Sequence, residues 1–117
     1  MKEGQIMDFI TLAKNRYSVR SYSEKQIEKD KINKILEAAY ISPSAKNKQS
    51  ARVYVVQSEE GIEKLRALTR CVYNAPTVMI IGYEESEQYV NEMEEGIVSG
   101  QQDASIVATH MMLEATE

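Results

Sequence analysis

Two arginines and a serine at alternate positions are the side chains in this chain with the clearest chemical potential. They are Arg16, Ser18 and Arg20, within the segment Arg-Tyr-Ser-Val-Arg. In an extended backbone, alternate residues project to one side, so all three hydrogen-bond donors would face the same way. Guanidinium groups match the oxygens of a phosphate in both geometry and charge. The segment is therefore a candidate phosphate site, although from these residues alone a solvated basic turn is the simpler interpretation.

Two amphipathic helices are expected on either side of this segment. Before it, over residues 4–14, the apolar side chains are Ile6, Phe9, Ile10 and Ala13. Their spacing is typical of one apolar helix face. After it, Ser23 and Gln26 are spaced like a capping box, and a periodic apolar pattern then continues to about Ile41.

A polar loop is predicted at residues 42–50, because Pro43 disfavours helical backbone at Ser42 and no periodicity follows. Beyond the loop, residues 52–57 and 77–83 are apolar on both faces, as in strands inside a sheet. A helix beginning near Ser58 separates them. Strands that alternate with helices predict a sheet covered on both sides.

The C-terminal third contains an acidic excursion, residues 84–102, and then an almost wholly apolar helix, residues 103–115, with Asp103 as its N-cap. Such a helix should be buried, either in the domain centre or between two subunits, and the second possibility predicts a homodimer. Its end carries Glu114 and Glu117 without a C-cap, so the natural polypeptide, or its ancestor, is expected to continue.

The composition limits the classes of function. The 117 residues suffice for one domain, 1–117, and the net charge of -4 argues against a general nucleic-acid or anionic-membrane surface. Cys71 and His110 are the only residues of their kinds, which excludes an internal disulfide and a His/Cys zinc site. We interpret Cys71 as an inert small hydrophobe and His110 as a core or interface residue. With no apolar run long enough for a membrane span, a cytoplasmic protein is expected.

Four features in this order resemble the nitroreductase family of FMN-dependent flavoproteins. They are Arg16-x-Ser18-x-Arg20, the loop Ser-Pro-Ser-x-x-Asn-x-Gln at 42–49, Ala-Pro at 75–76 before an apolar strand, and Asp-Ala-Ser-Ile at 103–106. The resemblance implies an α+β fold with a mixed β-sheet flanked by helices, incomplete at the C-terminus. It also implies a homodimer with FMN at the interface. Electrons would pass from NADH or NADPH to nitroaromatics, quinones or related acceptors.

The resemblance also implies the cofactor-binding residues. Arg16, Ser18 and Arg20 correspond to the phosphate and ribityl region of FMN. Pro43, Ser44, Asn47 and Gln49 correspond to the flavin ring, reached from the partner subunit. No catalytic side chain and no metal ligand is assigned, because the flavin itself reacts.

Two departures from the family pattern bear on activity. Gln49 is followed by Ser-Ala rather than by proline and an aromatic residue, and the sequence stops before the family's Gly-rich turn, further strand and C-terminal basic contact. The alternative function is therefore a truncated, noncatalytic domain that binds FMN or dimerises without turnover. A generic interaction domain with merely solvated arginines is a third possibility.

Overall fold

The computed structural model describes residues 8–117, so residues 4–7 of the first expected helix lie outside it. The helices are α1 (Phe9–Asn15), α2 (Lys29–Tyr40), α3 (Glu59–Leu68) and α4 (Gly100–Thr116). The strands are β1 (Ala51–Val56) and β2 (Val78–Tyr83), and the short 3-10 turns are η1 (Ala45–Asn47), η2 (Arg70–Val72) and η3 (Glu85–Glu87). Both expected strands and the helix between them are confirmed. The architecture is α+β, as the family resemblance implies.

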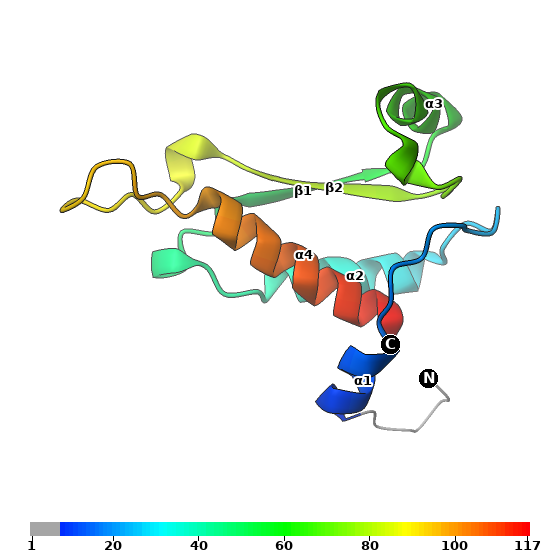
Figure 1. Ribbon diagram of the computed structural model, residues 1–117, viewed down its shortest axis with the longest axis horizontal. Coiled ribbons are helices and arrows are strands. Elements are labelled where there is room, and N and C mark those ends of the chain that lie inside the picture. The colour runs from blue at the N-terminus through cyan, green and yellow to red at the C-terminus, as the bar shows by residue number, and fades with distance from the viewer. Residues whose placement is uncertain (1–7) are drawn as a thin grey trace.

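The two strands form an antiparallel pair, in which Ala51 lies opposite Tyr83 and Val56 opposite Val78. Helices α2 and α4 lie side by side along one face of this pair (Figure 1). Because side chains alternate between the faces of a strand, Val53 and Ile81 point to the same side. There they pack against the main core, whose buried members are Ile35, Val107 and Met111.

The opposite face of the sheet is covered only at one end. Helix α3 and η2 pack there over Val56 and Val78, around a second core of Ile62, Val72 and Ala75. Further along the same face, Tyr54 and Ile80 lie opposite each other and are 59% and 42% exposed. The expectation of a sheet covered on both sides is therefore wrong for this part of the face in a single described chain.

The start of α2 differs from its expected capping box. The helix begins after Glu28, which makes no side-chain capping bond. Ser23 instead accepts a 3.4 Å hydrogen bond from the backbone of Lys25, and the Gln26 amide donates to the Pro76 carbonyl over 3.1 Å. Tertiary hydrogen bonds to the chain before β2 thus replace the local cap.

Helix α4 also begins earlier than expected. Ser99 is its N-cap and Asp103 lies in its first turn, so Asp103 as the N-cap is wrong. Val107 and Met111 are buried against the sheet, whereas Ile106 and Met112 are 37% and 49% exposed. The helix is therefore buried on one side only within a single chain.

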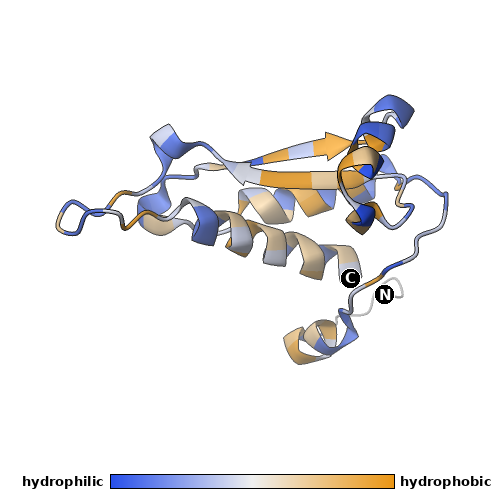
Figure 2. Ribbon diagram, turned by 45° about the horizontal axis from the view of Figure 1, so that its top comes forward, coloured by the Kyte–Doolittle hydropathy of each residue, from blue (hydrophilic) through white to orange (hydrophobic). Residues whose placement is uncertain are grey.

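The distribution of hydropathy follows this arrangement. Figure 2 shows apolar residues concentrated in the strands and along the helices beside them, while the connecting loops are largely hydrophilic apart from short apolar stretches in the loop before α4. Among residues 8–117, no helix is both long enough and apolar enough to cross a membrane.

Candidate functional site

The arginine segment directly follows α1. Asp8 caps this helix by accepting a 2.8 Å hydrogen bond from the backbone N–H of Thr11, which lowers the pKa of the Asp8 carboxyl. The helix ends at Asn15, and the backbone of Arg16 is extended, with φ −67° and ψ 129°. The chain then continues without helix or strand to the start of α2. The extended geometry expected for this segment is therefore present where it begins.

The three expected phosphate-binding side chains have no partner within the described part of the chain. Arg16 is half-buried, while Ser18 and Arg20 are exposed. None of them makes a side-chain hydrogen bond or ion pair with residues 8–117. As far as residues 8–117 are concerned, their donors are thus available to an anion from outside the chain.

The far end of this segment is attached beside the start of β2. The backbone N–H of Tyr22 donates to Asn74 Oδ1 over 3.0 Å, and Asn74 Nδ2 donates back to the Tyr22 carbonyl over 2.9 Å. The Gln26 contact with Pro76 lies close by in sequence and extends this attachment. These bonds fix the path of the extended segment at one end of the sheet.

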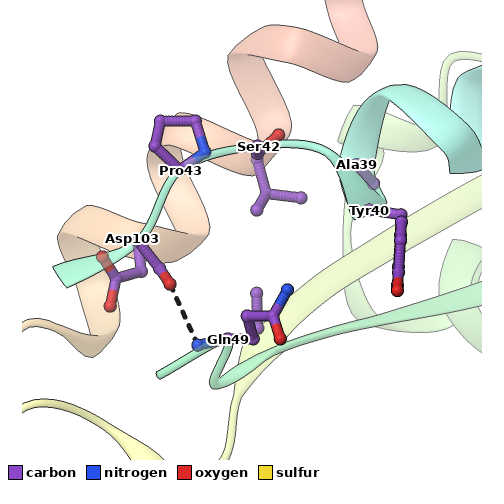
Figure 3. Close-up of a pocket in the computed structure, with 9 residues that line it drawn as sticks. Ala39, Tyr40, Ser42, Pro43, Gln49 and Asp103 are labelled. Carbon is purple, nitrogen blue, oxygen red and sulfur yellow. Dashed lines mark hydrogen bonds between the residues drawn. The ribbon is translucent and has the colours of Figure 1, made fainter. Parts of the chain in front are cut away.

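The loop at residues 42–50 has an unusual backbone. Lys46, Asn47 and Gln49 have φ values of 55°, 52° and 53°, in the left-handed region that residues with a Cβ seldom adopt. The backbone N–H of Gln49 donates to Ser44 Oγ over 2.9 Å (Figure 3), and Arg52 donates to the Gln49 carbonyl over 3.0 Å. These contacts hold a tight turn immediately before β1.

Asp103 holds the same loop from α4, and the sequence interpretation missed this role. Its carboxylate is only 2% exposed and accepts a 3.1 Å hydrogen bond from the backbone N–H of Ala45. A second bond comes from the Ser99 hydroxyl over 2.7 Å. An acidic residue on the buried side of an apolar helix needs such partners, so its position in the sequence was the available signal.

A cavity of about 280 Å³ opens between this loop, the end of α2 and the start of α4. It is lined by Ala39, Tyr40, Ser42, Pro43, Ser44, Gln49, Ala51, Asp103 and Val107 (Figure 3). Three of the four residues expected at a flavin ring, Pro43, Ser44 and Gln49, thus share one cavity. Asn47 does not line it. The side-chain amide of Gln49 has no partner in the part of the chain that is described.

The arginine segment and the cavity lie far apart within one chain. α1 lies near the C-terminal end of α4, whereas the cavity is at the start of this helix (Figure 1). A 17-residue helix is about 25 Å long. The same separation holds along the sheet, because the segment is attached before β2 and the cavity adjoins the start of the antiparallel β1. One chain does not bring the two groups of residues together.

The single cysteine and histidine lie outside this cavity. Cys71 is exposed in η2, so it is not buried as a small hydrophobe in the described chain, and its inertness stays a prediction. His110 is half-buried on α4.

The acidic excursion after β2 spans residues 84–99, and its arms meet at the bridge between Val90 and Val98.

Comparison with known proteins gives consistent matches. The family model described as "Nitroreductase family" matches residues 13–73, which are 61 of the 117 residues. A protein of Methanothermobacter thermautotrophicus, provisionally named NADH dehydrogenase/NAD(P)H nitroreductase, is 29% identical over 93% of this chain and 56% of its own length.

Solved structures agree in fold. A nitroreductase family protein from Clostridium difficile 630 superposes with a TM-score of 0.88 at 38% identity, covering 94% of this chain and 63% of that one. An FMN-dependent nitroreductase from Clostridium difficile R20291 has a TM-score of 0.73 at 29% identity, covering 92% of this chain and 60% of that one. The expected α+β fold is confirmed, and the chain spans about six tenths of the length of these relatives.

Proposed function

This chain belongs to the nitroreductase family, and we propose that residues 1–117 form the N-terminal portion of an FMN-dependent NAD(P)H oxidoreductase domain. The observation that carries the proposal is the cavity at the start of α4, which Pro43, Ser44 and Gln49 line. A solved relative described as FMN-dependent and a curated relative named as an NAD(P)H nitroreductase support the choice of cofactor and electron donor.

The residue types at the two places fit the two ends of FMN. Arg16 and Arg20 would neutralise its phosphate, with Ser18 donating a further hydrogen bond. The Gln49 amide, which can both donate and accept, would bond polar atoms of the ring, and Pro43 and Ser44 would border it. Asn47 is proposed as a ring contact from the same loop, although it lies outside the cavity lining.

Two copies of the chain would satisfy both ends of the cofactor. Because the arginine segment and the cavity lie at opposite ends of α4, we propose that the phosphate residues of one subunit face the ring loop of its partner in a homodimer. The bound flavin would supply the redox chemistry between NADH or NADPH and a nitroaromatic, quinone or related acceptor. The protein itself would bind, orient and shield it.

The alternative is a domain that binds FMN or dimerises without turnover. The separation within one chain favours its FMN-binding form, since a chain that stays monomeric holds only half of the proposed site in any one place. Retention of FMN without oxidation of NADH or NADPH would support this alternative.

The direct test is whether the purified protein retains flavin. We expect visible flavin bands to elute with the protein after FMN is added and the mixture is gel-filtered. Replacing both Arg16 and Arg20 with alanine should weaken FMN binding by about 1.5–3 kcal/mol for each charged hydrogen bond lost.

Lys14→Ala is the matched control for this test, because it removes a nearby exposed positive charge that lies on α1, before the extended segment begins. Equal FMN affinity in the wild type and in the double variant would reject the phosphate assignment. A wild-type protein that retains no FMN, whether it is a monomer or a dimer, would reject the proposed function.

A further inference from the structure

Asp103 is the one charged side chain that is buried among residues 8–117. A carboxylate removed from water needs hydrogen-bond donors. Both of its oxygens have one: Oδ1 accepts from the Ala45 backbone over 3.1 Å, and Oδ2 accepts from the Ser99 hydroxyl over 2.7 Å. This single side chain therefore connects the start of α4 to the loop that borders the cavity.

The main core fixes the position of this carboxylate. Asp103, Val107 and Met111 are spaced by four residues and so share one face of α4. Val107 and Met111 are both buried in the core cluster against α2 and the sheet. The helix can hardly slide or rotate without breaking that packing, so Asp103 is a rigid point of attachment for anything it binds.

The hydrogen bond from Ala45 to Asp103 lies beside the part of the loop that has left-handed backbone. Ala45 follows Ser44, whose hydroxyl accepts from the Gln49 backbone, and precedes the left-handed residues Lys46 and Asn47. Left-handed backbone at residues with a Cβ persists only where the surroundings impose it. The fixed Asp103 carboxylate, which accepts the hydrogen bond from the Ala45 N–H, is such a constraint.

We propose that Asp103 is a positioning residue: its buried carboxylate holds loop 42–50 in the shape that presents Pro43, Ser44 and Gln49 to the cavity. The meaning of that shape for the flavin ring rests on the proposed function above. Ser99 supports the carboxylate and also pairs with Tyr89, whose backbone N–H donates to Ser99 Oγ over 3.1 Å. The same small network thus connects the base of the acidic excursion to the loop.

A purely helical role for Asp103 makes a different prediction. A negative charge in the first turn of α4 also interacts favourably with the helix N-terminus, and that effect needs only the charge. The positioning role needs an acceptor oxygen opposite Ala45. Asp103→Asn removes the charge but keeps an acceptor oxygen, whereas Asp103→Ala removes both. The two variants therefore separate the two roles.

Limited digestion with trypsin measures the loop directly, because Lys46 and Lys48 are exposed cleavage sites within it. We expect Asp103→Ala to increase the rate of cleavage after these lysines about ten- to a hundredfold, as expected for loss of a charged hydrogen bond that keeps a segment closed. Cleavage after Lys64, on α3, should not change. Asp103→Asn should cleave at nearly the wild-type rate.

Asp30→Asn is the matched control, since it makes the same chemical change in the first turn of α2 at an exposed side chain. Equal cleavage of the loop in the wild type and in Asp103→Ala would overturn the proposal. So would an Asp103→Asn loop that opens as far as that of Asp103→Ala, because the charge alone would then explain the effect.

Two further measurements complete the test. Hydrogen exchange of the Ala45 amide in the wild type needs no variant: strong protection supports the bond to Asp103, and exchange at the rate of an unstructured amide overturns it. FMN titration followed by flavin fluorescence should show weaker binding by Asp103→Ala and recovery in Asp103→Asn. Unchanged affinity with an open loop would overturn the positioning role. Failure of the proposed function would give a different result. The wild type itself would then not bind FMN, whereas trypsin would still cleave the loop faster in Asp103→Ala than in the wild type.

Discussion

At the scale of single residues, charged side chains differ in whether the fold supplies them with a partner. Glu28 lies between Lys25 and Lys31, at 3.0 and 3.1 Å, and these ammonium groups hold the pKa of its carboxyl at about 2. Arg16 and Arg20 have no such partner in the described chain. An unpaired guanidinium keeps its full capacity for an external anion. Arg16 and Arg20 are therefore better candidates for binding an anionic ligand than Lys25 and Lys31, which are already paired with Glu28.

Glu114 near the end of α4 has an unfavourable environment. Burial, followed by repulsion from Glu117, raises the pKa of its carboxyl above the ordinary 4.5. The folded chain therefore binds this proton more tightly than the unfolded chain does. The resulting stabilisation is fully present below about pH 4.5 and is lost as the pH rises through the raised value.

We accordingly expect Glu114→Gln to be more stable than the wild type at pH 7, by about 0.2–0.5 kcal/mol, the size of a like-charge pair on a helix. The difference should shrink at pH 4. Urea unfolding at both pH values measures it, with Glu92→Gln as an exposed control. A gain in stability that is the same at both pH values would contradict the pKa argument.

At the scale of elements, α3 shows how local sequence signals specify a helix. The Ser58 hydroxyl accepts a 3.0 Å hydrogen bond from the Gly61 backbone, and Glu59 and Glu60 place negative charge at the N-terminus. Gly61 itself has no room for a side chain, since an added Cβ would approach Val56 Cγ1 to 2.7 Å. The start of α3 is thus determined by hydrogen bonding and by its close approach to β1.

Ser58→Ala should lower the free energy of unfolding by about 1 kcal/mol, because loss of the cap leaves a backbone donor of the first turn unsatisfied. Thermal or urea unfolding measures the loss. Ser86→Ala is the control, because Ser86 is an exposed serine in η3 that caps no helix. A Ser58→Ala chain as stable as the control would show that α3 begins where it does for reasons of packing alone.

How far the sequence predicts the structure follows from the range of the interactions. The periodic apolar patterns of α2 and α3 and the apolar runs of β1 and β2 depend on neighbouring residues, and all four elements are present in the expected order, although α2 begins later than expected. The start of α2 and the role of Asp103 depend on bonds across about 50 residues, to Pro76 and to Ala45, and were missed. The cavity likewise needs residues 39–51 to meet residues 103–107 of α4, which periodicity cannot indicate.

At the scale of the whole molecule, a single chain is more extended than a compact domain of its length. Its radius of gyration is 16.1 Å, whereas about 13 Å is typical of 117 residues. Apolar side chains remain exposed on the sheet, at Tyr54 and Ile80, and on α4, at Ile106 and Met112. A chain with this shape gains further apolar burial by association.

We therefore expect a dimer in light scattering at micromolar concentration, and a shift toward monomer when Ile106 or Met112 on α4 is replaced by glutamate. Burying an unpaired charge at an apolar interface is the physical reason. Leu68→Glu is the matched control, because Leu68 is 82% exposed at the end of α3, away from α4. A wild-type monomer would contradict the prediction, and a dimer unaffected by both α4 variants would place the interface elsewhere.

The bond between Ala45 and Asp103 also sets an order of events during folding. Its two residues are 58 positions apart, and the acceptor belongs to α4, which follows α2, the loop and β1 in the sequence. During synthesis from the N-terminus, α2, the loop and β1 all leave the ribosome well before α4 does. Until α4 has packed, nothing occupies the place opposite Ala45, and the left-handed turn lacks its fixed acceptor. Competence to bind a ligand at this loop is thus acquired only once α4 has packed against it.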